Sequence, residues 1–208
     1  YAGYFIAAVL ALTATGIDFS NLALIAGALG LGIGLGLQSI VNNFVSGLII
    51  LAERPIRVGD WVSLPTGEGV VRRINVRSTE IETFDSCSII LPNSLLVTEP
   101  VRNWTHNDNM GRFLVAVSVD YGNDAELVRK VLLETARAHE RVLSRPEPVA
   151  LLARFGPSGL DFELRAFVAD IFEAAGVASE IRFSLLTRFA EKGITIAPPL
   201  ALLQQPRA

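Results

Sequence analysis

Charge is almost missing from the first quarter of the chain. Residues 1–52 contain one charged side chain, Asp18, whereas residues 53–208 contain the other 20 acidic residues and all 18 lysines and arginines, for a net charge of −2. An uncharged front part argues against a chain that is soluble throughout and predicts membrane segments followed by a water-soluble part. The slightly acidic soluble part argues against nucleic acid as a partner, which requires a basic face.

Cysteine and histidine are also scarce. The single cysteine, Cys87, cannot form an intrachain disulfide, which fits a reducing cytoplasm, and we expect it to be a small buried hydrophobe. The two histidines, His106 and His139, have no partner at metal-site or catalytic-triad spacing. The sequence therefore predicts no enzyme activity, no metal and no cofactor.

Two long uncharged runs fill the front of the chain. Residues 1–17 are apolar and predict a transmembrane helix that is truncated at its start. Residue 1 is a tyrosine that already lies inside this apolar run, so we expect more protein upstream. The run has no signal-peptide pattern of a basic start and a cleavage site. Residues 20–53 predict a second helix, capped by Ser20 or Asn21 and ended before Pro55. Its charge-free core, residues 22–52, is longer than the roughly 20 residues of one span. The helix must therefore tilt, bend or leave the bilayer partway.

The water-soluble part predicts two domains of different class. Short strands separated by turns over residues 56–108 indicate a small all-β domain of Sm-like barrel type. Residues 109–198 predict the order strand, helix, strand, strand, helix, strand of an α+β ferredoxin-like domain. In that order we expect strands at 112–119, 149–155, 160–168 and 194–197, with helices at 124–139 and from Val177 to the stop at Gly193. Residues 199–208 form a C-terminal tail.

The front half of the second run combines leucine and glycine in a specific pattern. At about 100° per residue on a helix, one narrow side is bordered by glycines on both flanks. The side consists of Leu24, Ala28, Leu31 and Leu35, and the glycines are Gly27, Gly30 and Gly34 on one flank and Gly32 and Gly36 on the other. Small residues let membrane helices approach closely, so two smooth flanks indicate neighbours on both sides, as in a closed ring of copies. The stripe between them would line a pore, and rings of leucine would close it by excluding water.

The back half of the same run changes character at Gln38-Ser39. Polar residues gather on one side, and Ile40, Val41, Phe44, Leu48 and Leu51 lie opposite, which is typical of a helix at the membrane surface. A bend at Gln38-Ser39 would carry the chain from the pore axis to that surface. Four arginines follow at once, Arg54, Arg57, Arg72 and Arg73. By the positive-inside rule they place this end and the later domains in the cytoplasm.

Residues 30–62, GLGIGLGLQSIVNNFVSGLIILAERPIRVGDWV, resemble the third transmembrane helix and following segment of the small-conductance mechanosensitive channel family. Residues 90–94, ILPNS, resemble a further motif of that family, and the likeness is closer to its large multi-span members. The resemblance implies a homoheptamer in a bacterial inner membrane with a cytoplasmic vestibule. It implies that Leu31 and Leu35 form the two leucine rings that close the pore. The tail after Pro199 would form a small strand barrel at the base of the vestibule.

The hinge differs from the family pattern. Gln38-Ser39 match a Gln-Gly kink, but Ser39 stands where the minimal member has glycine. Gly47 matches a second family glycine and is the rival hinge. The sequence leaves both positions open.

The leading functional hypothesis is an ion channel opened by membrane tension, which releases ions and small solutes on hypo-osmotic shock. Its expected partners are copies of itself, membrane lipids and the permeating solutes. Two alternatives remain: a channel of the same architecture gated by a ligand at the cytoplasmic domain, and a membrane-anchored scaffold that conducts nothing.

Overall fold

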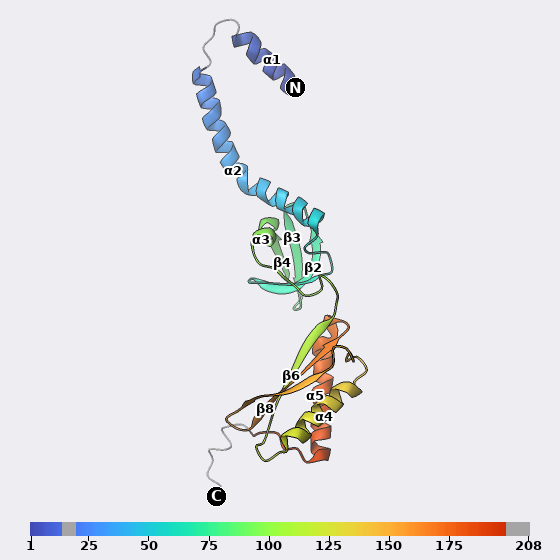
Figure 1. The fold of residues 1–208 in the computed structure, drawn as a ribbon. Helices are drawn as coiled ribbons and strands as arrows, with labels where there is room; N and C mark the ends of the chain where they lie inside the picture. The colour runs from blue at the N-terminus through green and yellow to red at the C-terminus, as the bar shows by residue number, and fades with distance from the viewer. Residues whose placement is uncertain (14–19, 199–208) are drawn as a thin grey trace. The chain divides into compact units, whose positions relative to one another are not determined.

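A computed structural model describes residues 1–13 and 20–198 (Figure 1). The turn expected around Asp18 and the tail 199–208 lie outside the described residues. Two helices, α1 (Ala2–Thr13) and α2 (Ser20–Glu53), precede the β-containing parts. The chain divides into two compact units, Tyr1–Gly59 with Leu64–Val101 and Asp60–Ser63 with Arg102–Ala208, and each is described by itself.

Helix α2 has the predicted extent. It begins at Ser20 and its last residue is Glu53, one residue before Arg54, whose φ of 52° is left-handed and turns the chain out of the helix. Figure 1 shows that α2 changes direction about midway along its length. Although it bends, α2 is one helix that runs from its leucine- and glycine-rich half into its more polar half.

The first unit contains an antiparallel meander of β2 (Gly67–Ile74), β3 (Ser78–Thr83) and β4 (Ser88–Pro92). A short helix, α3 (Asn93–Thr98), follows directly and was not predicted. Val71, Ile81, Leu91 and Leu96 are buried in this unit. Pro92 ends β4 because it has no N–H to donate to a strand ladder.

The expectation that Cys87 is buried is wrong. Cys87 lies in the tight turn between β3 and β4 and is exposed, and its N–H donates to Thr83 Oγ1 at 3.1 Å. A hairpin turn points its side chains to solvent because no neighbouring strand covers it. The general tendency of free cysteine to be buried does not apply at such a position.

The second unit is a two-layer α+β domain. Its sheet has the order β6 (Gly111–Val119), β8 (Leu160–Val168), β7 (Val149–Phe155), all antiparallel, and helices α4 (Ala125–Ala138) and α5 (Ala174–Lys192) cover one face (Figure 1). The core between helices and sheet consists mainly of Phe113, Val115, Val128, Leu132, Phe162, Leu164, Ile181, Leu185 and Phe189. A short pair of strands, β1 (Trp61–Leu64) and β5 (Arg102–Asn103), and one 3-10 turn at Ile171–Glu173 complete the elements.

The predicted helix ends are confirmed by specific caps. Asp124 caps α4, since its carboxylate accepts from the N–H of Glu126 at 2.9 Å. Gly193 ends α5 with a φ of 67°, which glycine adopts without cost.

The predicted last strand, residues 194–197, is reduced to one bridge between Ile196 and Val119 of β6. Two backbone hydrogen bonds flank this bridge, from the N–H of Asp120 to the carbonyl of Thr195 and from the N–H of Ala197 to the carbonyl of Ser118, both at 2.9 Å. Pro198 follows directly and has no N–H to continue the pairing.

Candidate pore helix and its anchor

The front half of α2 is exposed at every residue whose side chain the structure describes. From Leu24 to Leu37 every residue is exposed, and Leu31 and Leu35 are 67% and 64% exposed. Leu24 and Ala28 share this exposure. Leu24–Glu53 is the one stretch in the described residues that is long and apolar enough to cross a membrane. So much exposed apolar surface requires lipid or other protein chains around it.

The five glycines of this half lie against open space. A Cβ atom added at Gly27, Gly30, Gly32, Gly34 or Gly36 would meet nothing within 4 Å. Glycine in a helix interior costs about 1 kcal/mol relative to alanine, so five of them without a contact in their own chain need another reason. Close approach by a neighbouring helix is the usual reason in membranes.

The back half of α2 is held by its own unit. Ser46, Gly47 and Ile50 are buried and Asn43 is half-buried, and these positions recur every three or four residues, so they form one side of the helix. The opposite side, formed by Ile40, Val41, Phe44, Leu48 and Leu51, is exposed. The helix therefore presents its polar side to the β meander and α3, and its apolar side outward.

Gly47 is the closest point of this contact. A Cβ atom there would lie 2.4 Å from the carbonyl oxygen of Val76 and 2.6 Å from Asn93 Nδ2. Real Cβ atoms do not approach other atoms so closely, so glycine is the residue that fits. Gly47, which the sequence offered as a hinge, has a packing role in this structure.

Asn93 connects the elements around this point. It is fully buried, its Oδ1 accepts from Thr79 Oγ1 at 2.9 Å, and its Nδ2 donates to the carbonyls of Asn75 and Val76 at 3.0 and 3.2 Å. These bonds give the amide oxygen and the amide nitrogen each a partner, as a buried polar group requires. Asn93 therefore fixes the turn before β3 against the start of α3.

Asn43 joins α2 to α3 directly. Its Oδ1 accepts from the N–H of Ser94 at 3.0 Å, and its Nδ2 donates to the carbonyl of Ser39 at 2.8 Å. The free N–H groups at the start of α3 are thus partly satisfied by a side chain of α2. We define Asn43, Gly47, Asn93 and Ser94 as the anchor. Sequence reasoning assigned a role to none of these contacts, although the motif at residues 90–94 contains two of the four residues.

The four arginines that the sequence predicts near the membrane are all exposed but fall into two pairs. Arg54 and Arg57 border an apolar hollow of about 310 Å³ with Ile50, Leu51, Ile56, Val58 and Ile74. Arg72 and Arg73 lie on β2, where Arg72 forms an ion pair with Glu82 of β3. A second apolar hollow, of about 500 Å³, is lined by Ile40, Val41, Phe44, Asn75, Val76, Arg77 and Ser78. Apolar hollows thus adjoin the back half of α2 at two places along its length.

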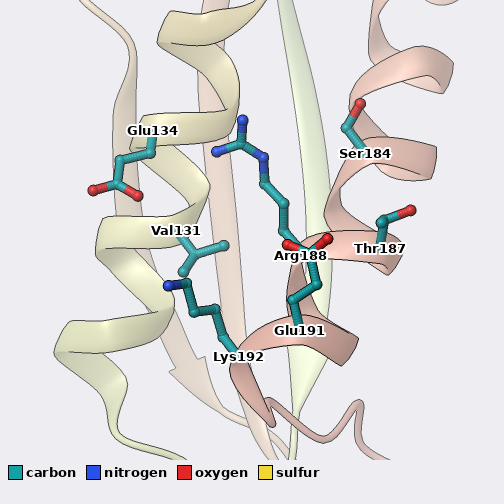
Figure 2. A pocket seen from close by; sticks show the side chains of 7 residues that line it. All are labelled: Val131, Glu134, Ser184, Thr187, Arg188, Glu191 and Lys192. Atoms are coloured by element: carbon teal, nitrogen blue, oxygen red, sulfur yellow. The ribbon is translucent and has the colours of Figure 1, made fainter.

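A polar hollow of about 440 Å³ lies between α4 and α5 in the second unit (Figure 2). Its lining combines the acidic Glu134 and Glu191 with the basic Arg188 and Lys192, and the guanidinium of Arg188 points between the two helices. The two signs of charge balance, so this hollow favours neither anions nor cations. Within the described ranges no group of three His, Cys, Asp or Glu residues could hold a metal.

Two family models match the chain. Residues 39–106 match the model described as "Mechanosensitive ion channel, beta-domain", and residues 113–196 match "Mechanosensitive ion channel MscS, C-terminal". The first begins in the back half of α2 and includes the anchor, and the second covers the α+β domain. Together they account for nearly all of the chain after the exposed half of α2.

The chain is also similar to named proteins. It is 42% identical over 197 residues to the mechanosensitive channel MscK of Escherichia coli, and 37% identical over 184 residues to the miniconductance mechanosensitive channel MscM of the same organism. These alignments cover 93% and 88% of this chain but only 18% and 17% of the relatives. The chain thus spans less than a fifth of those long proteins, and the expected likeness to large members is confirmed.

A shorter relative and two solved structures agree. An MscS family protein of Archaeoglobus fulgidus is 32% identical over 200 residues, which are 96% of this chain and 70% of that protein. The Helicobacter pylori MscS structure in its closed state has a TM-score of 0.84 at 22% identity and covers 98% of this chain and 79% of its own. Arabidopsis thaliana MSL1 has a TM-score of 0.75 at 18% identity, covering 95% and 73%. The sequence relatives and the matching domains show that this chain belongs to the MscS family of mechanosensitive ion channels.

Proposed function

We propose that the chain forms the pore and cytoplasmic part of a homo-oligomeric ion channel that membrane tension opens. The observation that carries the proposal is an exposed leucine stripe on α2 between two flanks of glycine that meet no atom of their own chain. Membership of a channel family, rather than an enzyme family, supports it. By resemblance the oligomer is a heptamer.

Leu24, Ala28, Leu31 and Leu35 line the pore, with Leu31 and Leu35 as the gate. Rings of leucine at close approach exclude water and block ions without a plug. Gly27, Gly30, Gly32, Gly34 and Gly36 contact the neighbouring copies and let them slide. Tension favours the state that occupies more membrane area, so outward tilting of these helices opens the gate.

We place the bend of α2 at Gln38-Ser39. The support is that Gly47, the other candidate, is packed against Val76 and Asn93 and cannot change its backbone freely. The hydrogen bond from Asn43 to the carbonyl of Ser39 links the end of the bend to the anchor. The exposed apolar side of the back half then lies in the membrane surface and contacts lipid.

Arg54 and Arg57 follow this helix, so we assign this end and both later domains to the cytoplasm of a bacterial inner membrane. The two helices α1 and α2 then belong to a multi-pass membrane part. Ions and small solutes are the permeating species, and no cofactor takes part.

Exchange of Leu31 or Leu35 for serine tests the proposal. Leu31→Ser and Leu35→Ser should give channels that leak at rest and impair growth, because serine rings hold water in the pore. Leu29→Ser, on the back of the helix, is the matched control, since Leu29 has a similar exposure of 63%. Patch-clamp recording of the pressure threshold measures the effect. Unchanged thresholds in both gate variants would contradict the pore assignment.

Purified protein in plain liposomes under suction separates the proposal from its alternatives. Currents that need only suction support tension gating. Currents that need an added cytosolic ligand would support the ligand-gated channel instead. Intact oligomers without any stretch-activated current would assign the scaffold.

A further inference from the structure

Two segments of the second unit are hydrogen-bonded to each other where the chain first enters that unit. The unit consists of Asp60–Ser63 and Arg102–Ala208, and the first of these segments closely follows the end of α2 in sequence. The N–H of Trp61 donates to Thr105 Oγ1 at 3.1 Å, and the N–H of Trp104 donates to the carbonyl of Trp61 at 2.9 Å. Trp61 is therefore held by the segment that leads into the α+β domain.

Three aromatic rings meet at this point. Trp61 contacts Trp104 with ring centroids 6.2 Å apart and Phe172 with centroids 5.4 Å apart, both in tilted orientations. These separations lie in the range that aromatic pairs prefer. Trp61 also packs against the buried core of the α+β domain, whereas Trp104 and Phe172 are each 42% exposed. We call Trp61, Trp104 and Phe172 the aromatic cluster, which joins β1 to the α+β domain through side chains.

Phe172 lies in the 3-10 turn directly before α5, and this turn is held at several points. The N–H of Ile171 donates to the carbonyl of Asn109 at 2.7 Å, and the Asp170 carboxylate accepts from the N–H of Phe172 at 3.1 Å. A Cβ atom at Gly111 would lie 2.7 Å from Ile171 Cα, so the turn packs directly on the start of β6. Close packing of this kind transmits displacements, so a shift of the Phe172 ring would also shift the start of α5.

The start of α5 is in turn linked to the end of α4. Arg141 forms ion pairs with Glu173 and Glu180, and His139 Nε2 lies 2.9 Å from Glu180 Oε2. Hydrogen bonds with Arg141 and His139 lower the pKa of the Glu180 carboxyl below its usual value, so this carboxylate stays charged at neutral pH. The contacts thus continue from the aromatic cluster to both helices of the α+β domain.

The chain between α2 and the aromatic cluster is itself held in place. Pro55 has a fixed φ, and the Ile56 side chain is 3% exposed. The N–H of Gly59 donates to the carbonyl of Val71 at 2.8 Å. These residues fix the chain to the first unit as far as Gly59. A displacement of the first unit must therefore be taken up close to Trp61.

We propose that Trp61 and Phe172 are positioning residues for gating, through which the α+β domain restrains the pore helix in the closed state. This inference rests on the channel of the proposed function and adds a cytoplasmic restraint to its gate. Opening widens the ring of pore helices and displaces the first unit, to which α2 is fixed. The ring contact opposes that displacement because it holds β1 against the start of α5. If the contact exists only in the closed state, its loss should shift the closed-to-open equilibrium by about fivefold per subunit.

Tryptophan fluorescence of the assembled channel tests the contact itself. This chain has two tryptophans, and both lie in the aromatic cluster. Trp104→Phe leaves Trp61 as the only reporter, and Phe172→Ala should then move its emission to longer wavelength because water reaches the ring. An emission that Phe172→Ala does not shift would overturn the inference.

Phe155→Ala is the matched control for Phe172→Ala. Phe155 is also exposed, and it lies opposite Leu160 in the sheet. Leu160 pairs with Val119 at one end of β6, whereas the 3-10 turn packs on the other end, at Gly111. The two ends are about 25 Å apart at the rise of a strand. Phe155→Ala should therefore leave the tryptophan emission unchanged.

The pressure threshold for opening in membrane patches tests the role in gating. Phe172→Ala and Trp61→Ala should each lower the threshold, and Phe172→Tyr, which keeps the ring, should leave it unchanged. The double variant should lower it no further than one single variant does, because both remove the same contact. Trp61→Ala combined with Phe155→Ala should instead show the sum of the two separate effects. Thermal unfolding followed by circular dichroism shows which variants fold, and Phe172→Ala carries the test if Trp61→Ala does not fold.

The inference is overturned if Phe172→Ala leaves the threshold unchanged or raises it, or if the effects of the two cluster variants add in full. A lower unfolding temperature with an unchanged threshold would give the aromatic cluster a purely structural role. The two proposals fail in different ways. An unaltered chain that gives no stretch-activated current rejects the channel function, whereas a stretch-activated current whose threshold does not respond to Phe172→Ala rejects only the restraint.

Discussion

The two halves of α2 use glycine for opposite purposes. In the front half five glycines meet no atom of their own chain, whereas in the back half Gly47 would place a Cβ atom 2.4 Å from the backbone of Val76. From Leu24 to Leu37 the front half is exposed all round, and the back half is buried along one side. One continuous helix thus joins a front half without packing contacts in its own chain to a back half that packs against its own β meander and α3.

This difference gives the two halves of α2 separate roles in the proposed opening of the channel. In the proposed channel, the glycines that meet no other part of their own chain are what lets the front half slide against neighbouring copies. The contact at Gly47 and the bonds of Asn43 and Asn93 fix the back half to the β meander. We infer that membrane tension tilts the front half of α2, while the back half stays fixed to the β meander.

The largest expected effect comes from the centre of the anchor. Asn93→Ala removes three hydrogen bonds and leaves the buried Thr79 hydroxyl and two carbonyls without that partner. The free energy of unfolding should fall by about 3 kcal/mol. Thermal unfolding of detergent-purified protein, followed by circular dichroism, measures the loss. Val97→Ala, at an exposed position of the same short helix, should change the unfolding temperature little; an equal loss in both would contradict a special role for Asn93.

A pair of glycine substitutions tests the comparison directly. Gly47→Ala should lower stability by about 2 kcal/mol, because overpacking exceeds the helix propensity that alanine gains. Gly34→Ala meets no atom of its own chain and should not destabilise the isolated subunit. In the assembled channel Gly34→Ala should instead raise the pressure needed for opening, as its methyl group obstructs sliding. Equal stability of the two variants would remove the distinction between the halves.

Much of the fold could be predicted because its signals are local. The helix Ser20–Glu53, the hairpin of β7 and β8 and the stop at Gly193 each follow from neighbouring residues: an uncharged run, a Gly-Pro-Ser-Gly turn and a left-handed cap. Helix α3 was missed because its six residues show no helical period. The exposure of Cys87 was missed because a composition tendency was applied to a turn.

The candidate site also has one part that local sequence signals predict and one part that they do not. Helical spacing alone identifies the leucine stripe and its glycine flanks, since every residue involved lies within about four consecutive helical turns. The packing role of Gly47 depends on Val76 and Asn93, which are distant in sequence, so no periodicity reveals it. A glycine in a helix can serve as hinge or as contact, and only the tertiary structure distinguishes them.

Asn43 gives the smallest stability effect and the most direct link between the two halves. Asn43→Ala removes the bond to the N–H of Ser94 and the bond to the carbonyl of Ser39, both at a partly exposed site, so stability should fall by about 1 kcal/mol. Asn42→Ala, at the exposed neighbouring position, should leave stability unchanged. If the anchor holds the back half fixed while the front half tilts, Asn43→Ala should also change the pressure threshold or the time course of channel closing in membrane patches. The reason is that the bend at Ser39 loses its link to α3. A threshold and time course identical to those of Asn42→Ala would mean that the anchor holds the fold without influencing the gate.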